Sequence, residues 1–436
     1  MRERVGFGVR LRSPERRQLG WVAQCADDLV GPSHPVRSIA AVLEKLDLSG
    51  FYAGIKAREG VSGRDSTDPG LLVGLWLYGC VRGIGSGREL ARRCEESAPF
   101  LWLCGGVTVN HRLLSDFRTD HGSALDDLFT QVIASLVDQD IVKVSRISQD
   151  GVRVRVSARA SSFRREERLR ELLTQAREHV EQLRQQVDGG VAAELSARQK
   201  GARKKAAEDR LKRLEQAVAQ LPELKQKQAK AEERAGEGKQ GEKVRKRQPR
   251  VSTTYPEARR MKMPNGGFNP AVNVQLATDT SSRAVVGVEV TFEGTDSVGL
   301  SEPMRQQVEQ RTHKKVQQHL IDGGYMRKED IEKAGEEVEL FVPPKVARLP
   351  ANRGNELQPK KGDSPALLRW KKRMASEEGK EIYKQRAATS ETVNADLRTY
   401  RGLSQITVRG TDKLRSVALW CALAYNIFHF AKNLLG

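Results

Sequence analysis

The sequence has little of what marks secreted and membrane proteins. Its five cysteines are an odd number without Cys-x-x-Cys spacing, so it predicts neither a disulfide framework nor a structural zinc site. No run reaches the roughly eighteen uncharged apolar residues of a membrane span. The longest apolar run, 417–430, contains Asn426 and His429, and the basic N-terminus lacks the apolar core of a signal peptide. We therefore expect a cytoplasmic protein.

Acidic residues are scarce relative to basic ones. The chain of 436 residues has 75 Lys and Arg against 56 Asp and Glu, a formal net charge of +19. Such a charge attracts polyanions, so nucleic acid is the first partner indicated and an anionic membrane surface the second. A merely soluble or ribosome-associated basic protein remains an alternative. Aromatic residues make up only 5%, but 38% apolar content suffices for two or three compact domains.

Residues 1–140 are predicted to form an all-α N-terminal domain. Apolar residues recur at three- and four-residue steps over 39–46 and 71–80, and Gly-containing breaks at 83–87 and 105–106 separate the helices. The candidate DNA contacts of this domain stand at the start of a further helix: His111, Arg112 and Arg118. A helix-turn-helix-like DNA reader and a bundle that only mediates subunit contacts are both open.

Residues 163–243 predict a helical hairpin inserted into a second domain. This stretch is dense in Arg, Glu, Gln and Lys, with apolar residues at heptad positions. Because Asp188, Gly189 and Gly190 break the pattern, an antiparallel coiled hairpin is favoured, with residues 232–241 as a flexible return.

The flanking residues, 141–162 and 244–436, predict an α/β domain. Near Ile147 the apolar period changes from about 3.6 to 2, which indicates a half-buried strand. Further strand signals lie at 271–278, 284–292, 316–321 and 338–342, and a helix is predicted over 299–308. The resulting order, in which a long insertion follows the first strand and helices flank the fourth, resembles an RNase H-like domain with a mixed five-stranded sheet.

Three acidic residues are candidate metal ligands. Asp150 interrupts the first strand pattern, and Asp322 ends a later strand directly before two glycines. Glu391 lies on a helix predicted over 384–398. Acids at strand ends commonly build metal sites, but a turn or capping aspartate and an exposed surface glutamate are the alternatives from the residues alone.

Four segments resemble the DDE transposases of bacterial insertion sequences, in the branch with a helical N-terminal transposase domain: SQDGVRVRVSA, ARRMKMPNGGFNPAVNVQLATD, HLIDGGYM and YKQRAATSETVNADLRTYRG. The resemblance implies that Asp150, Asp322 and Glu391 are catalytic acids that bind two Mg²⁺ ions, with Mn²⁺ as a substitute. It also implies a double-stranded DNA substrate, comprising element ends and target, a homodimer in the synaptic complex, and action at the bacterial nucleoid without a membrane partner.

The Tyr, Arg, Glu and Lys signature of that family appears as Tyr383, Arg386, Glu391 and Arg398. The resemblance implies that Arg386 and Arg398 contact DNA phosphate and that Tyr383 is either a phosphate contact or a packing residue. Two departures stand out: four residues instead of the usual three separate Arg386 from Glu391, and Arg398 replaces Lys, which keeps the charge but as a planar fork. A third departure is Tyr255, where an Asp is expected.

Further basic residues follow the predicted hairpin. Arg259, Arg260 and Lys262 are candidate contacts to the DNA backbone, with a solvated face as the alternative. Asp296 is foremost a helix N-cap signal, and a structural role is the alternative for His111 and the expectation for His319.

The predicted chemistry is two-metal phosphoryl transfer. Two divalent ions about 3.5 to 4 Å apart stabilise the attacking and leaving oxygens, and carboxylates are suitable ligands for them. The resemblance therefore implies a transposase that binds the terminal inverted repeats of an insertion sequence, cleaves the DNA ends and joins the 3′ ends to target DNA. The alternatives are an RNase H-like nuclease such as a junction resolvase, and an inactive relative that only binds DNA.

Overall fold

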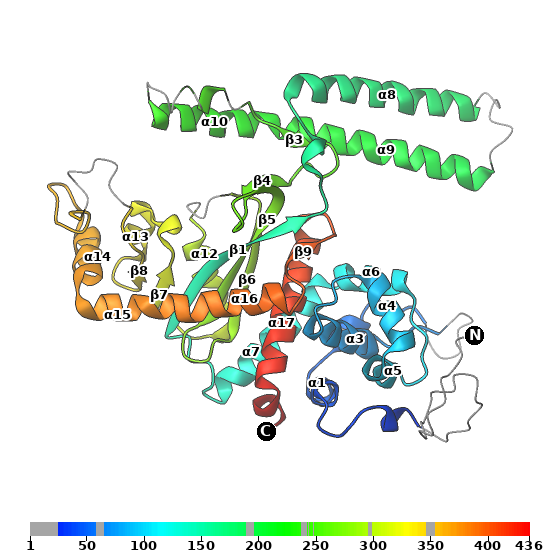
Figure 1. Ribbon diagram of the computed structural model, residues 1–436, viewed down its shortest axis with the longest axis horizontal. Helices are drawn as coiled ribbons and strands as arrows, with labels where there is room; N and C mark the ends of the chain where they lie inside the picture. Colours follow the sequence, from blue (N-terminus) through cyan, green and yellow to red (C-terminus); the bar gives the residue numbers. More distant parts are fainter. Residues whose placement is uncertain are drawn as a thin grey trace, which may run out of the picture.

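The computed structural model describes residues 25–57, 65–188, 196–236, 242, 244–246, 248–294, 299–345 and 354–436. Figure 1 shows a helical N-terminal region beside a mixed sheet, with a long helical arm above the sheet. Asp296 and the predicted break at Gly189 and Gly190 lie outside the described residues.

The N-terminal region is helical, as predicted. Its helices begin where the sequence supplies caps: the side chains of His34, Asp68, Ser86 and Asn110 accept backbone N–H groups at the starts of four of them. Gly105, at φ +51°, ends one helix in the left-handed conformation. The elements are η1 (Ala26–Leu29), α1 (Pro35–Glu44), α2 (Ser49–Tyr52), α3 (Pro69–Val81), α4 (Gly87–Glu96), α5 (Ala98–Cys104), α6 (His111–Asp120) and α7 (Gly122–Asp138).

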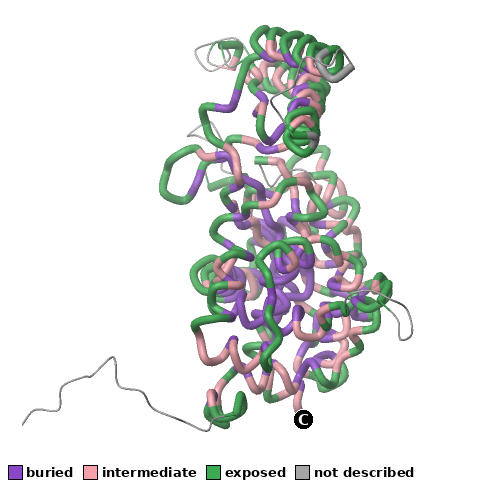
Figure 2. The backbone as a smooth tube through the Cα atoms, turned by 90° about the vertical axis from the view of Figure 1, so that its right-hand side faces the viewer, coloured by how far each residue is buried: buried purple, intermediate pink, exposed green. Residues whose placement is uncertain are grey.

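A continuous hydrophobic core joins the helical region to the sheet (Figure 2). Helix α3 is apolar on all sides, and α17 (Thr411–Leu435) is buried over most of its length, so both lie inside. Helix α17 packs against α1, α3, α6, α7 and the strand β6 (Val285–Thr291). The predicted division at residue 140 stays a proposal, because the two regions share this core.

The predicted mixed sheet is present. Its central path runs β6-β5-β1-β7-β8, with β5 antiparallel to β1 and β6, and β7 parallel to β1 and β8. These strands are β1 (Arg146–Val156), β5 (Phe268–Asp279), β6, β7 (Gln318–Ile321) and β8 (Glu339–Phe341). All five overlap the predicted strand signals.

The prediction of five strands was too low, because the described sheet has seven. The additional strands are β4 (Arg259–Lys262), which pairs with β5, and β9 (Gln405–Ile406), which pairs with the far end of β1. Strands of four and two residues are too short to show an alternating pattern. They form because the long strands β1 and β5 extend beyond their other partners and offer free backbone edges.

Helices flank the later strands. They are α12 (Ser301–Thr312), η3 (Gly323–Tyr325), α13 (Lys328–Ala334), α14 (Pro365–Ala375), α15 (Glu377–Arg386), the π-helical segment η5 (Ala387–Glu391) and α16 (Thr392–Thr399). Helix α15 contacts β7, and η5 contacts both β1 and β5. The helix that carries the third predicted acid therefore lies directly against the strands that carry the other two.

The arm consists of α8 (Glu166–Asp188), α9 (Ala197–Ala219) and α10 (Leu221–Ala235). Helices α8 and α9 lie side by side and antiparallel (Figure 1). Leucines and alanines pack between them. A two-stranded ribbon, β2 (Phe163–Arg164) with β3 (Val251–Ser252), closes the base of the arm. The predicted flexible return was wrong over residues 232–235, which are helical; residues 237–241 lie outside the described residues. Supercoiling of the helix pair stays a prediction.

Candidate active site

Two of the three predicted acids come from adjacent parallel strands. Gln149 in β1 pairs with Ile321 in β7, so the residues that follow them, Asp150 and Asp322, stand next to each other at one end of the parallel pair. Asp322 also begins η3, where its carboxylate accepts the N–H of Gly324 at 3.4 Å. The pairing of β1 with β7 therefore brings the two acids together, although they lie far apart in the sequence.

The third acid lies on a helix that contains a π-helical turn. Helix α15 runs through η5 into α16 without a break. A π turn bonds residue i to residue i+5 instead of i+4, so it absorbs the one extra residue that the sequence has between Arg386 and Glu391. The two side chains consequently reach each other, with Arg386 Nη2 at 3.5 Å from Glu391 Oε1.

The guanidinium of Arg386 lies among all three acids. Its Nη1 is 3.6 Å from Asp150 Oδ2, and its Nη2 is 3.8 Å from Asp322 Oδ1 and 3.5 Å from Glu391 Oε1. The side chain of Arg386 is 13% exposed, whereas those of Asp150, Asp322 and Glu391 are 23%, 50% and 63% exposed. The arginine is thus the deepest charge of the cluster, and the acids surround it on the solvent side.

The three carboxylates attract the guanidinium of Arg386 but do not provide acceptors for all of its buried N–H groups. Its Nη1 is buried and forms no hydrogen bond within the described part of the chain. Burial lowers the pKa of Arg386, but Tyr383 and the charges of Asp150 and Asp322 outweigh burial and raise it. Contacts of 3.5 to 3.8 Å are loose for charge-assisted hydrogen bonds, which are usually about 2.7 to 2.9 Å.

Asp150 is held in a defined orientation. Its Oδ1 accepts the N–H of Gly151 at 2.8 Å, and its Oδ2 accepts the side-chain amide of Asn394 at 3.1 Å. Nearby, the hydroxyl groups of Ser148 and Ser390 lie 2.5 Å apart and tie β1 to η5. Sequence reasoning assigned no role to Asn394, although its position three residues after Glu391 was a usable signal, since residues at i and i+3 share a helix face.

The donor set fits a hard divalent cation in ligand type and charge, because it consists of carboxylate oxygens around a shared positive charge. In the present side-chain positions, however, no three His, Cys, Asp or Glu side chains among the described residues lie close enough together to hold a metal ion. The cation that the three acids share here is Arg386.

The other residues predicted near the acids occupy different surroundings. The ring of Tyr383 is 6.0 Å from the Arg386 guanidinium, and burial raises the pKa of its hydroxyl. Arg398 is exposed on α16. Tyr255 is buried, and its hydroxyl oxygen accepts the N–H of Gly410 at 3.0 Å.

The three basic residues of β4 divide into two kinds. Arg260 and Lys262 are exposed on the same side of the strand. Arg259 instead donates to the carbonyls of Pro256, Glu257 and Ala258 and, at 2.6 Å, to Gln220 Oε1 at the junction of α9 and α10. Its donors join the sheet to the arm, so Arg260 and Lys262 are the exposed basic residues of β4.

The candidates of the N-terminal region lie together on α6. His111 and Arg112 are exposed in its first turn. Arg118, later in the same helix, is buried. The Arg118 guanidinium stacks on the Trp76 ring at 4.6 Å and donates from Nη1 to the carbonyl of Gly85 at 2.6 Å. All three residues line one groove between the helices and the sheet.

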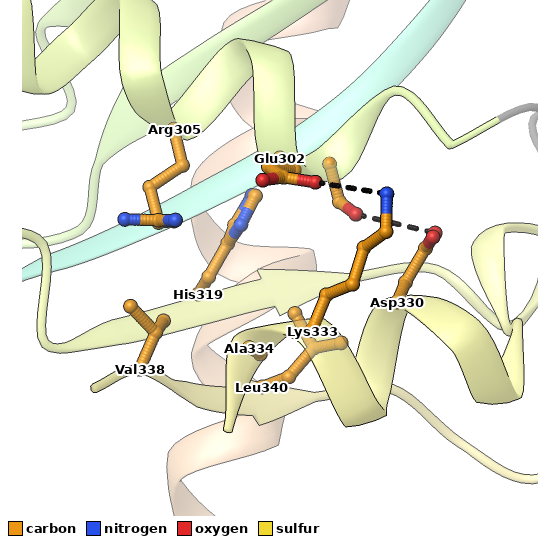
Figure 3. Close-up of a pocket in the computed structure, with 9 residues that line it drawn as sticks. Glu302, Arg305, His319, Asp330, Lys333, Ala334, Val338 and Leu340 are labelled. Atoms are coloured by element: carbon orange, nitrogen blue, oxygen red, sulfur yellow. Dashed lines mark hydrogen bonds and ion pairs between the residues drawn. The ribbon is translucent and has the colours of Figure 1, made fainter. Parts of the chain in front are cut away.

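A separate small cavity beside β7 is enclosed by α12, α13 and β8 (Figure 3). Its volume of about 20 Å³ suffices for one water molecule. Burial, together with the charge of Arg305, lowers the pKa of His319 in its wall to about 3, so this imidazole is neutral at physiological pH. The ion pair between Lys333 and Glu302, at 3.6 Å, spans the cavity. The structural role expected for His319 agrees with this position.

Among the described residues, no helix combines the length and apolar character needed to cross a membrane.

Two segments of the chain match known families. Residues 24–120 match the family described as Transposase domain (DUF772), and residues 348–431 match the family described as Transposase DDE domain. No curated protein and no solved structure matches the chain. The first matched segment contains α6, and the second contains α14 to α16 with Arg386 and Glu391.

Proposed function

We propose, because both matched segments support a DDE-type transposase of an insertion sequence, that the chain binds the terminal inverted repeats of its element, cleaves the DNA ends and joins the 3′ ends to target DNA. The observation that carries this proposal is the meeting of Asp150, Asp322 and Glu391 around Arg386. The order β6-β5-β1-β7-β8, with only β5 reversed, supports an RNase H-like fold for the sheet domain.

The three acids are proposed as the catalytic residues and as ligands of two divalent ions, Mg²⁺ or Mn²⁺ as a substitute. Bound ions would supply charge stabilisation to the attacking and leaving oxygens of the scissile phosphodiester. Asn394 orients the carboxylate of Asp150. When Arg386 leaves the acids, its planar fork suits a phosphate oxygen pair of the DNA.

DNA contacts are proposed for the exposed members of the basic set predicted from the sequence: Arg398, Arg260, Lys262, His111 and Arg112. Tyr383 is proposed to support Arg386, whose guanidinium lies over its ring. Arg259 is proposed as an indirect contributor that fixes β4 to the arm. A homodimer in the synaptic complex and action at the nucleoid follow from the proposed reaction, which joins two DNA ends.

The alternatives remain a junction resolvase and an inactive DNA-binding relative. The DNA on either side of the gene distinguishes the first, because short inverted repeats bracketing the reading frame would mark an insertion sequence. The second is disfavoured by the presence of all three acids.

The test is magnesium-dependent cleavage of a labelled duplex that carries the terminal repeat. Asp150→Asn, Asp322→Asn and Glu391→Gln remove the charge but little volume, so each should lower cleavage by about 10⁴-fold or more while thermal unfolding and duplex binding stay normal. Glu381→Gln is the matched control, because Glu381 is an exposed acid of α15 that pairs with Lys384. Substantial cleavage by an acid variant would remove that residue from the catalytic set, and cleavage without divalent metal would overturn the mechanism.

A further inference from the structure

A groove of about 750 Å³ lies between the helical region and the sheet, away from the three acids. Its walls come from α3, α4 and α6 on one side and from the residues that follow β1 and β9 on the other. The residues that carry its chemistry are Ser86, Arg88, His111, Arg112, Arg118 and Thr407. The residues that line it include no Asp or Glu.

Arg118 is the centre of this groove. Its side chain is 5% exposed, and its Nε forms no hydrogen bond within the described residues. Only Nη1 has an acceptor there, the carbonyl of Gly85. Burying an ion without a counter-ion is unfavourable. Stacking on the Trp76 ring offsets part of that cost. An anion in the groove would offset the rest.

Two helix starts add donors to the same groove. Gly87 and Arg88 are the first residues of α4, whose leading N–H groups have no acceptor inside the helix. The cap from Ser86 Oγ reaches Glu89 N at 3.5 Å, which is weak. At α6 the cap is stronger, since Asn110 Oδ1 accepts two N–H groups at 2.9 and 3.0 Å. The start of α4 is therefore the better anion donor of the two.

The groove is rigid before any ligand binds. A Cβ on Gly87 would lie 2.4 Å from Ser115 Oγ, so α4 and α6 meet at the closest distance that glycine permits. Gly83 and Gly402 approach each other through their backbones, both at positive φ. Buried Arg401 donates from Nη1 to the carbonyl of Val81 at 3.0 Å and pairs with Asp396 at 2.7 Å. A preformed groove loses little entropy on binding.

We propose that this groove binds a backbone phosphate of duplex DNA, held jointly by the helical region and the sheet. Arg118 and the backbone N–H groups at the start of α4 bind the phosphate at the floor of the groove. Arg88 and Arg112 contact the same DNA strand at the exposed rim. Because the groove joins both parts, the DNA bound there has a fixed position relative to the three acids. This inference rests on the proposed function and adds a DNA-positioning site to it.

The experiment measures the affinity of the full-length protein for a fluorescein-labelled duplex of arbitrary sequence, in EDTA, over a range of KCl concentrations. The log–log slope falls by about 0.9 for each phosphate that the protein no longer neutralises. Arg88→Gln with Arg112→Gln should therefore reduce the slope by about 1.8. Both side chains are exposed, so the fold should not depend on them.

The matched control is Arg92→Gln with Arg93→Gln. Arg92 and Arg93 lie on α4, as Arg88 does, and both pair with Glu89 at 2.8 Å, whereas Arg112 on α6 has only a longer contact, 3.8 Å, to Asp116; the net charge changes by the same amount. The control should keep the wild-type slope. An equal decrease of the slope in both double variants, or a decrease in neither, would overturn the proposal.

Arg118→Lys adds a direct test of the floor, because it keeps the charge and removes the fork; it should weaken duplex binding. If Arg118→Lys fails to fold, the salt slope of Arg88→Gln with Arg112→Gln, measured against its control, still tests the proposal. Inorganic phosphate that raises the melting temperature of the wild type, without a slope change in the rim variants, would assign the groove to a small anion instead. Because EDTA removes divalent metal, these outcomes are independent of cleavage, which Asp150→Asn tests separately.

Discussion

Arg386 and Arg118 are both largely buried, and each has a guanidinium nitrogen without a hydrogen bond among the described residues, yet their surroundings have opposite charge. Arg386 lies within 3.8 Å of three carboxylates. Arg118 lies in a groove whose lining includes no acid. In the first site the protein supplies an excess of negative charge, and in the second an excess of positive charge.

An unsatisfied buried arginine therefore has no single role, because its neighbours decide which ion would complete the site. In our proposals a metal cation displaces Arg386 from the acids, whereas a phosphate anion joins Arg118.

Among substitutions of the residues around the acids, the largest effect is expected for a neutral partner of Asp150. Asn394→Ala removes the amide that holds Asp150 Oδ2, so the carboxylate loses its fixed orientation. Outer-sphere partners of this kind are worth about 10- to 100-fold in activity or metal affinity. Cleavage of the terminal-repeat duplex should fall by that factor, while the salt slope of duplex binding stays unchanged. A variant with wild-type cleavage would show that the other contacts of Asp150, including the Gly151 N–H, suffice to orient the carboxylate.

An intermediate effect is expected from removing the internal cation of the acid site. Arg386→Gln takes away the charge with which a metal ion competes, so the acids should bind Mn²⁺ about tenfold more tightly, equivalent to about 1.4 kcal/mol. Calorimetric titration with Mn²⁺ alone measures this without a reaction. Lys384→Gln is the control, since Lys384 is an exposed cation of the same helix that pairs with Glu381. Weaker binding in Arg386→Gln would mean that the arginine organises the acids for the metal.

The last effect, on stability instead of cleavage or metal affinity, concerns His319, a buried base that can be neutral. Its pKa is lowered by burial to about 3, against about 6.5 when unfolded. The unfolded chain therefore binds a proton that the folded chain does not, and stability decreases as the pH falls below 6.5. From pH 7.5 to 5.5 the loss is about 1.4 kcal/mol.

Urea unfolding at these two pH values measures the loss, and His319→Asn should reduce it. His313→Asn is the control, because His313 is exposed. An unchanged pH dependence in His319→Asn would assign the loss to other groups.

The sequence by itself determined the kinds of element and the family. Apolar periodicity located the N-terminal helices, the arm and the five main strands, because each pattern is local to its element. The motifs around Asp150, Asp322 and Glu391 predicted a transposase, and the matches over residues 24–120 and 348–431 confirm that family. The individual roles of the acids remain proposals.

Only the tertiary structure decided how these parts meet. The extra residue after Arg386 was visible as a spacing, but whether it shifts Glu391 away or is absorbed depends on η5 packing against β1 and β5. The roles of Asn394 and Arg259 depend on partners 244 and 39 residues away. A local pattern cannot report such contacts, because it encodes which face of an element is buried and not which element covers it.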